Sequence, residues 1–202
     1  MKNYIITIGR EFGCGGREIG RTLAGELGIP FYDKDLVDMA AKEAGVNVDV
    51  FQQNDEVVGR MRYMKLLKDN IYGSTSAFYT DQAVDAQAKV IHDIADRHEP
   101  CIIFGRCGDY ILREYRNVVN FFLYAPLPYR VKHLMELYHL NELDTIKLIQ
   151  KVDRQRHNYY KFVTGKNRGD RDGKNMELDV SKFGVGGCVK MMSTAVEYLY
   201  DK

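Results

Sequence analysis

The chain has 202 residues, of which 45% are hydrophobic and 28% are charged, as is usual for a globular protein with one well-buried core. Its formal net charge of +1 argues against a dedicated nucleic-acid surface. It has no apolar run long enough to span a membrane and no signal-peptide pattern, and its four cysteines lack C-x-x-C spacing. We therefore expect a cytoplasmic protein that binds neither nucleic acid nor membranes.

Strands and helices are predicted to alternate along the chain. The strands are short apolar runs at residues 4–8, 29–33, 101–104, 118–124 and 176–180. The helices, which show apolar residues at helical spacing or stop at a glycine, are residues 17–27, 34–44, 80–97 and a last helix that carries residues 189–199. This order indicates an α/β fold with a parallel sheet covered by helices on both faces.

Two segments interrupt the alternation. Residues 46–99 contain no convincing strand, and their sequence predicts two or three helices. Residues 151–174 carry eight Lys or Arg against three Asp, with glycines at 165, 169 and 173, which indicates the end of a helix and then a mobile loop. We expect one domain over residues 1–202, with a core of 1–45, 100–150 and 175–202 and two inserted flaps.

The glycine-rich junction between the first strand and the first helix is the most informative feature. Its glycines can adopt the backbone angles of an anion cradle, and the helix N-terminus adds free amides and a positive dipole end. The sequence therefore predicts a phosphate site at Gly13, Cys14, Gly15, Gly16, Arg17 and Glu18. The alternative is a glycine-rich turn that serves only helix–sheet packing.

The loop differs from the usual P-loop pattern G-x-x-x-x-G-K-[ST], in which the lysine reaches the β- and γ-phosphates and the hydroxyl holds Mg²⁺. Arg10 stands at the first glycine position, Gly16 at the lysine position and Arg17 at the hydroxyl position. Arg17 is predicted to supply the lysine's charge, with Arg10 as a further cation of the loop. No Ser or Thr of the loop remains to bind the metal.

Further candidates stand where strands end, because ligands gather at the carboxyl ends of parallel strands. Arg106 is predicted to touch substrate, or else to pair with an acidic neighbour such as Asp109. Cys107 reads as a small packed residue in preference to a nucleophile. Asp33 is predicted to orient a metal-bound water or act on an acceptor hydroxyl, or to cap the helix that follows.

Arg154 and Arg156 in the basic segment are predicted to reach different targets, because residues two apart do not share a helix face. One would contact donor phosphates and the other an acceptor phosphate; the alternative is a solvated basic surface. Arg130, early in a helix, reads as surface charge. No His or Cys spacing resembles a metal site, so we expect no protein-ligated metal centre.

The chain resembles the P-loop nucleoside monophosphate kinases, and most closely a cytidylate-kinase-like family. The start G-R-E-F-G-x-G-G-R-E-I-G matches residues 9–20, with Cys14 in the variable slot. The segment V-x-G-R-C-x-D-Y-I-L matches residues 103–112, with Ile103 in place of the valine, and F-x-Y-A-P-x-x-x-R matches residues 122–130.

The resemblance implies a three-layer P-loop NTPase fold with a five-stranded parallel sheet of order 2-3-1-4-5. It implies an acceptor-binding insertion over 46–99 and a LID over 151–174, with ATP and Mg²⁺ as cofactors and a nucleoside monophosphate-like acceptor. Catalysis would rest on cations around the transferred group. On this chain these are Arg17, Arg106, Arg154 and Arg156. A nucleotide-binding sensor without turnover is the competing hypothesis.

Overall fold

The computed structural model describes residues 3–33, 36, 39 and 81–200. Five strands form one parallel sheet in the order β2-β3-β1-β4-β5. They are β1 (Ile5–Arg10), β2 (Phe31–Tyr32), β3 (Cys101–Phe104), β4 (Val118–Tyr124) and β5 (Met176–Asp179). The predicted fold class and strand order are therefore confirmed.

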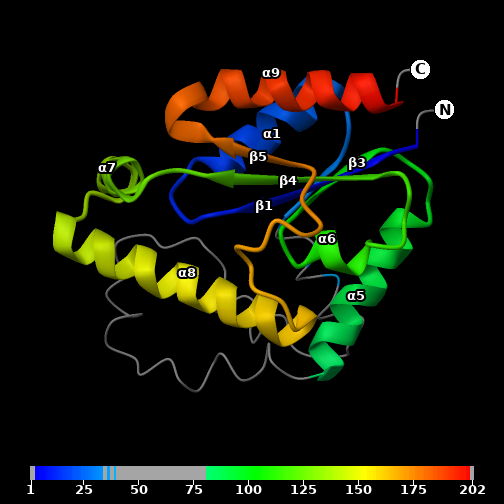
Figure 1. Ribbon diagram of the computed structural model, residues 1–202, viewed down its shortest axis with the longest axis horizontal. Helices are drawn as coiled ribbons and strands as arrows, with labels where there is room; N and C mark the ends of the chain where they lie inside the picture. Colours follow the sequence, from blue (N-terminus) through cyan, green and yellow to red (C-terminus); the bar gives the residue numbers. More distant parts are fainter. Residues whose placement is uncertain (1–2, 34–35, 37–38, 40–80, 201–202) are drawn as a thin grey trace.

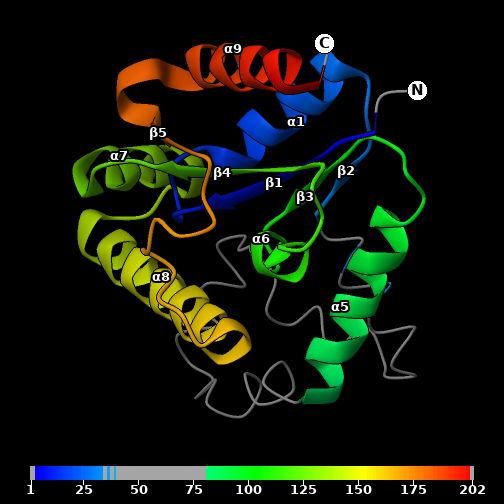
Figure 2. The ribbon, with the colours of Figure 1, turned by 45° about the vertical axis from the view of Figure 1, so that its right-hand side comes forward.

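Helices cover both faces of this sheet (Figure 1). On one face lie α1 (Gly16–Leu27) and α9 (Val180–Tyr200), the latter broken at Gly184. On the other lie α5 (Asp81–Ala95), the short α6 (Gly108–Ile111) and α8 (Glu142–Thr164). The view in Figure 2 shows the same two layers, with α7 (Leu127–Tyr138) next to the start of α8.

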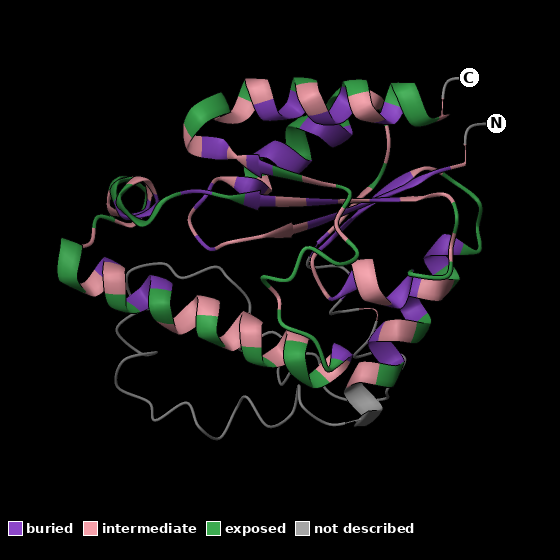
Figure 3. Cartoon of the chain, viewed as in Figure 1, coloured by how far each residue is buried: buried purple, intermediate pink, exposed green. Residues whose placement is uncertain are grey.

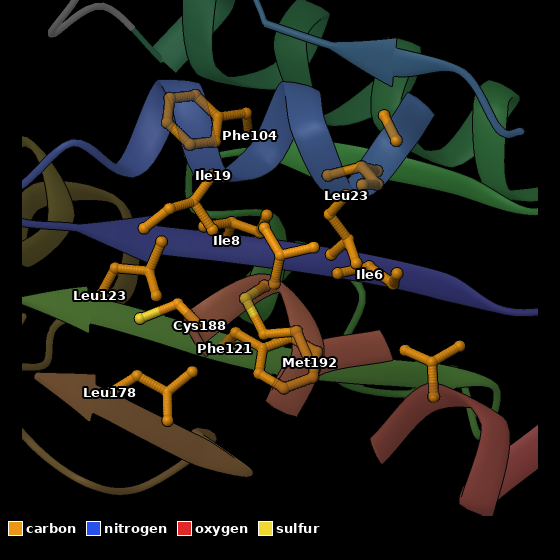
Figure 4. Packing of buried hydrophobic residues seen from close by; sticks show 14 of the residues in the cluster. Ile6, Ile8, Ile19, Leu23, Phe104, Phe121, Leu123, Leu178, Cys188 and Met192 are labelled. Carbon is orange, nitrogen blue, oxygen red and sulfur yellow. The ribbon is translucent and has the colours of Figure 1, made fainter. Parts of the chain in front are cut away.

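The alternation of side chains along the buried strands explains why both faces are covered. Ile6 and Ile8 of β1 pack with Ile19 and Leu23 of α1, whereas Ile5 packs on the opposite face with α5 and β3. Figure 4 shows the first of these clusters, and Figure 3 shows that the middle of the sheet is buried. This core holds the carboxyl ends of the strands in fixed positions beneath the loops that follow them.

Most predicted elements agree with the structure to within a few residues, and β3 and β4 agree at both ends. β1 begins one residue later than predicted and runs two residues further, to Arg10, because Gly9 and Arg10 pair with Phe122 and Leu123 of β4. β2 is shorter than predicted. Gly28 ends α1 in the left-handed conformation, as its position predicts.

The two flaps stay predictions. The helix predicted over residues 34–44, and residues 46–80 of the first flap, lie outside the described residues except for positions 36 and 39. Within the second flap, residues 151–164 continue α8, which begins at Glu142, and residues 165–174 form no helix or strand. Among the described residues, no helix is long and apolar enough to cross a membrane.

Candidate active site

A cavity of about 420 Å³ opens at the carboxyl end of β1, between the glycine loop, α7 and α8. Its wall includes three elements of the predicted phosphate site: the loop, the first turn of α1 and one arginine of the basic segment. The lining residues relevant to charge are Arg10, Glu11, Arg17, Glu18, Arg21, His133 and Arg156. Four arginines against two glutamates give this wall a net positive charge, which suits an anionic ligand.

The backbone of the loop has the shape that its glycines predict. Gly13 and Gly15 are left-handed, with φ of 83° and 85°. A Cβ at Gly13 would lie 2.7 Å from Leu134 Cδ1, so both conformation and space require glycine there. The N-cap residue of α1, Gly15, makes no side-chain cap bond, and Gly16, Arg17 and Glu18 of the first turn line the cavity.

Not every residue of the predicted loop site presents its side chain to the cavity. Gly13, Gly15, Gly16, Arg17 and Glu18 line it. Cys14 is fully buried instead, its thiol 3.6 Å from the carbonyl oxygen of Leu123, and burial raises its pKa. Cys14 therefore contributes packing and a backbone amide to the loop, and its thiol stays protonated at neutral pH.

Arg17 and Asp33 lie together, although sequence reasoning treated them separately. Arg17 Nε donates to Asp33 Oδ2 at 2.7 Å, and Nη2 lies 3.4 Å from Oδ1. Asp33 is buried, so its charge requires this partner. The pair links the first turn of α1, where Arg17 lines the cavity, to the end of β2. The alternative role of Asp33, as the cap of the helix that follows, concerns a helix outside the described residues.

The two arginines of α8 diverge as their spacing predicts. Arg156 lines the cavity, donates from Nη1 to the carbonyl oxygen of Arg10 at 3.2 Å and lies over the ring of Phe12. Arg154 is exposed and is not part of the cavity wall. The structure thus brings Arg156, and not Arg154, to the glycine loop.

Arg168 is a further cation near Arg156, and the sequence analysis did not identify it. Its side chain is 15% exposed and its Nη1 lies 3.8 Å from Asp153 Oδ1. Shielding from water, then repulsion from the guanidinium groups of Arg10 and Arg168, places the pKa of Arg156 well below its ordinary value. Three guanidinium groups that repel one another form a site that an anion would stabilise.

Arg106 follows β3 in a left-handed conformation, with φ of 56°. Its carbonyl oxygen accepts a bond from Gln87 Nε2 at 3.5 Å, and it does not line the cavity. Asp109, the alternative partner for Arg106, accepts from the hydroxyl of Tyr160 at 2.9 Å. Cys107 is buried and burial raises its pKa, which agrees with a packed residue and not with a nucleophile.

Arg130 is not a surface charge, contrary to the sequence-based interpretation. It is buried, with Nη1 2.5 Å from Asp153 Oδ2 and Nε 3.4 Å from Glu11 Oε2. Asp153 Oδ1 also accepts from the amide of Phe12 at 3.0 Å. Because these partners come from the loop, α7 and α8, the ion pairs clamp the glycine loop to both helices, a long-range arrangement with no local sequence signal.

No group of three or more His, Cys, Asp or Glu side chains among the described residues is arranged to hold a metal ion. Two carboxylates near the phosphate loop already have protein partners. Glu11 accepts from the amide of Ala125 at 3.2 Å, and Asp33 is paired with Arg17. The described residues thus offer an anion more contacts than they offer a cation.

Several solved structures are similar to this one. An uncharacterised protein from Eubacterium ventriosum ATCC 27560 is similar in structure, with a TM-score of 0.74 and 25% identity over 98% of this chain and 99% of that chain. A gluconokinase from Sinorhizobium meliloti 1021 has a TM-score of 0.55 and 14% identity, over 98% of this chain and 95% of that chain. A shikimate kinase from Bacteroides thetaiotaomicron has a TM-score of 0.52 and 13% identity, over 96% of this chain and 98% of that chain. The last two likenesses show the fold alone.

A comparison with curated protein sequences gives no match. The model of the cytidylate kinase-like family matches residues 5–182, which confirms the resemblance of the sequence motifs. Because this model covers most of the chain, the chain belongs to the cytidylate kinase-like family.

Proposed function

We propose that this protein transfers the γ-phosphoryl group of ATP to a small-molecule acceptor, with a nucleoside monophosphate as the first class to test. The observation that carries the proposal is the convergence of uncapped α1 amides, two left-handed glycines and Arg10, Arg17 and Arg156 on one cavity. Such a set of fixed donors and cations suits a triphosphate and the charge that moves between its oxygens.

The reaction would form a bond from an acceptor oxygen to Pγ and break the bond from Pγ to the β,γ-bridging oxygen. ADP leaves; an ionised phosphate acceptor has no proton to lose, whereas a hydroxyl acceptor would release its proton to solvent. The amides of the α1 first turn would bind the donor phosphates, and Arg156 would reach them from α8. Arg17 would stabilise charge at the cavity wall beside its partner Asp33, whose carboxylate is the candidate contact for the acceptor.

Arg106 and Arg154 belong to the proposal as cations for the acceptor side, since neither lines the donor cavity. Their targets would lie beyond that cavity, toward the flaps. Mg²⁺ fits the site mainly through the donor's own phosphates and water, as Mg²⁺ commonly binds in kinases. When bound, it would neutralise charge on the donor phosphates; Glu11 already accepts from the amide of Ala125, and Asp33 is already paired with Arg17.

One observation favours a second candidate, a nucleotide sensor without turnover. Gly16 and Arg17 stand where the P-loop pattern has its lysine and its metal-binding hydroxyl. A single experiment separates the two functions. Purified protein is incubated with ATP and Mg²⁺ and a panel of nucleoside monophosphates and small hydroxylated acids, and ADP is measured.

Acceptor-dependent ADP formation would support the kinase and identify its acceptor class. ATP binding in calorimetry without ADP formation across the panel would support the sensor. Absence of ATP binding at millimolar concentration would contradict both, because each needs the donor cavity to hold a triphosphate.

A further inference from the structure

Arg10 occupies the place that the missing lysine leaves. In the P-loop pattern the residue at position 16 is a lysine that reaches the β- and γ-phosphates. Here it is glycine, and the stem of Arg10 fills the adjacent volume. A Cβ at position 16 would lie 3.1 Å from Cβ and 3.2 Å from Cγ of Arg10. A side chain at position 16 would therefore compete with Arg10 for the same space.

A second glycine makes room for the other end of Arg10. Its guanidinium lies over the ring of Phe104, with Cζ 4.0 Å from the ring centroid. A Cβ at Gly105 would collide with Nη1 of Arg10, and Gly105 is left-handed with φ of 78°. The side chain thus runs from the end of β1 past Gly16 to the end of β3, and both Arg10 and Phe104 line the cavity.

We propose that Arg10 is the donor-phosphate cation of this protein, in the role of the P-loop lysine, and that Gly16 is the substitution that makes room for it. This rests on the proposed function, because it assumes a nucleoside triphosphate in the cavity. Arg17, for which the sequence suggested this role, has its guanidinium bonded to Asp33, which does not line the cavity.

The geometry suits the chemistry of the donor. A guanidinium presents a planar fork to two phosphate oxygens and keeps its proton, so it acts only through charge and hydrogen bonds. Arg10 would stabilise the charge that gathers on the β-phosphate when the bond from Pγ to the bridging oxygen breaks. Arg156 lines the same cavity and donates to the carbonyl oxygen of Arg10 at 3.2 Å, so the two arginines are neighbours at the proposed donor site.

The test moves the charge back to its usual place. Arg10→Gly removes the cation, and Arg10→Gly with Gly16→Lys restores the P-loop pattern, since the lysine no longer meets the stem of Arg10. Arg10→Met keeps an apolar stem beside Gly16 and guards against loss of folding. Arg113→Met is the matched control: its guanidinium also lies on an aromatic ring, 4.3 Å from the centroid of Tyr110, but away from the cavity.

Affinities for ATP, ADP and AMP are measured by calorimetry with Mg²⁺, and folding by thermal unfolding. We expect Arg10→Gly and Arg10→Met to weaken ATP and ADP binding by about 10- to 100-fold, the range of a hydrogen bond to a charged group, with less than about threefold for AMP. The double variant should recover most of the loss, and Arg113→Met should bind as the wild type does.

Arg10→Met with unchanged affinity for ATP would overturn the role of Arg10 and leave the proposed function intact. A folded double variant that recovers no affinity would do the same. A wild-type protein that binds neither ATP nor ADP would overturn the proposed function, and this inference with it.

Discussion

The glycine loop and the basic segment 151–174 were both predicted to contact phosphate. The loop has the conformation that the sequence predicts, whereas only one of the two predicted arginines of the basic segment lines the cavity. In the loop, the glycines that the sequence marks adopt the left-handed conformations expected of them, as Gly13 and Gly15 show. In the basic segment, Arg156 lines the cavity while Arg154 is exposed. A glycine indicates a local backbone requirement. The spacing of two arginines indicates that they point in different directions, but not which of them lies at the site.

Replacing the two arginines of α8 one at a time gives the largest expected contrast. Arg156→Met should lower the rate of ADP formation by about 100- to 1,000-fold, the loss typical of a donor aimed at developing charge. Arg154→Met should leave ATP affinity within about twofold, because a surface substitution changes free energies little. Equal effects of the two variants on ATP affinity would break the comparison.

The clamp between the two regions should show the largest effect on folding. Asp153→Asn removes the carboxylate that holds buried Arg130, so we expect a loss of about 2 to 4 kcal/mol in the free energy of unfolding, measured in urea. Glu142→Gln, in the exposed first turn of the same helix, should cost about 0.5 kcal/mol. Similar losses in the free energy of unfolding for both variants would show that the ion pairs of Asp153 stabilise the fold no more than an exposed charge does.

Two glycines near α1 test whether the loop conformation matters apart from charge. Gly13→Ala should destabilise the fold by about 1 to 3 kcal/mol and weaken ATP binding, because the added Cβ meets Leu134 and the left-handed angle disfavours alanine. Gly25→Ala, at an exposed helix position with nothing within 4 Å, should stabilise by about 0.5 to 1 kcal/mol. Urea unfolding of a Gly13→Ala variant as stable as the wild type would contradict the steric argument.

A smaller effect concerns how α8 is held on its other side. Burial raises the pKa of Asp109, although the hydroxyl of Tyr160 donates to it. The native state then binds more protons than the unfolded state between the ordinary carboxyl pKa and the raised one, so stability falls as pH rises through that window.

Asp109→Asn should remove this fall. The free energy of unfolding of the variant relative to the wild type should therefore rise as pH increases through that window. A difference that does not change with pH would show that Asp109 ionises normally.

The same contrast explains how far the sequence could be read. β3 was predictable because its continuous apolar run lies between Pro100 and Gly105, and β4 because a mostly apolar run ends shortly before Pro126. The strand order followed from the family resemblance and not from periodicity. The phosphate loop was predictable because Gly13 and Gly15 must be glycine for local reasons.

The contacts that complete the site are long-range, so no local pattern reveals them. Asp153 meets the loop across 141 residues of chain, and Arg130 was read as surface charge although it is buried. The pairing of Arg17 with Asp33 depends on how α1 packs beside β2. One signal was available for Arg10: it stands at the first glycine position of a pattern whose lysine is absent.

The most direct test of the account is a crystal structure of the protein with a non-hydrolysable ATP analogue and Mg²⁺. We expect the phosphates in the cavity, within hydrogen-bond distance of the amides of residues 13–18, with Arg10 and Arg156 in contact with them. Nucleotide bound elsewhere on the protein, or an empty cavity at saturating analogue, would contradict the central claim that this loop is a phosphate site.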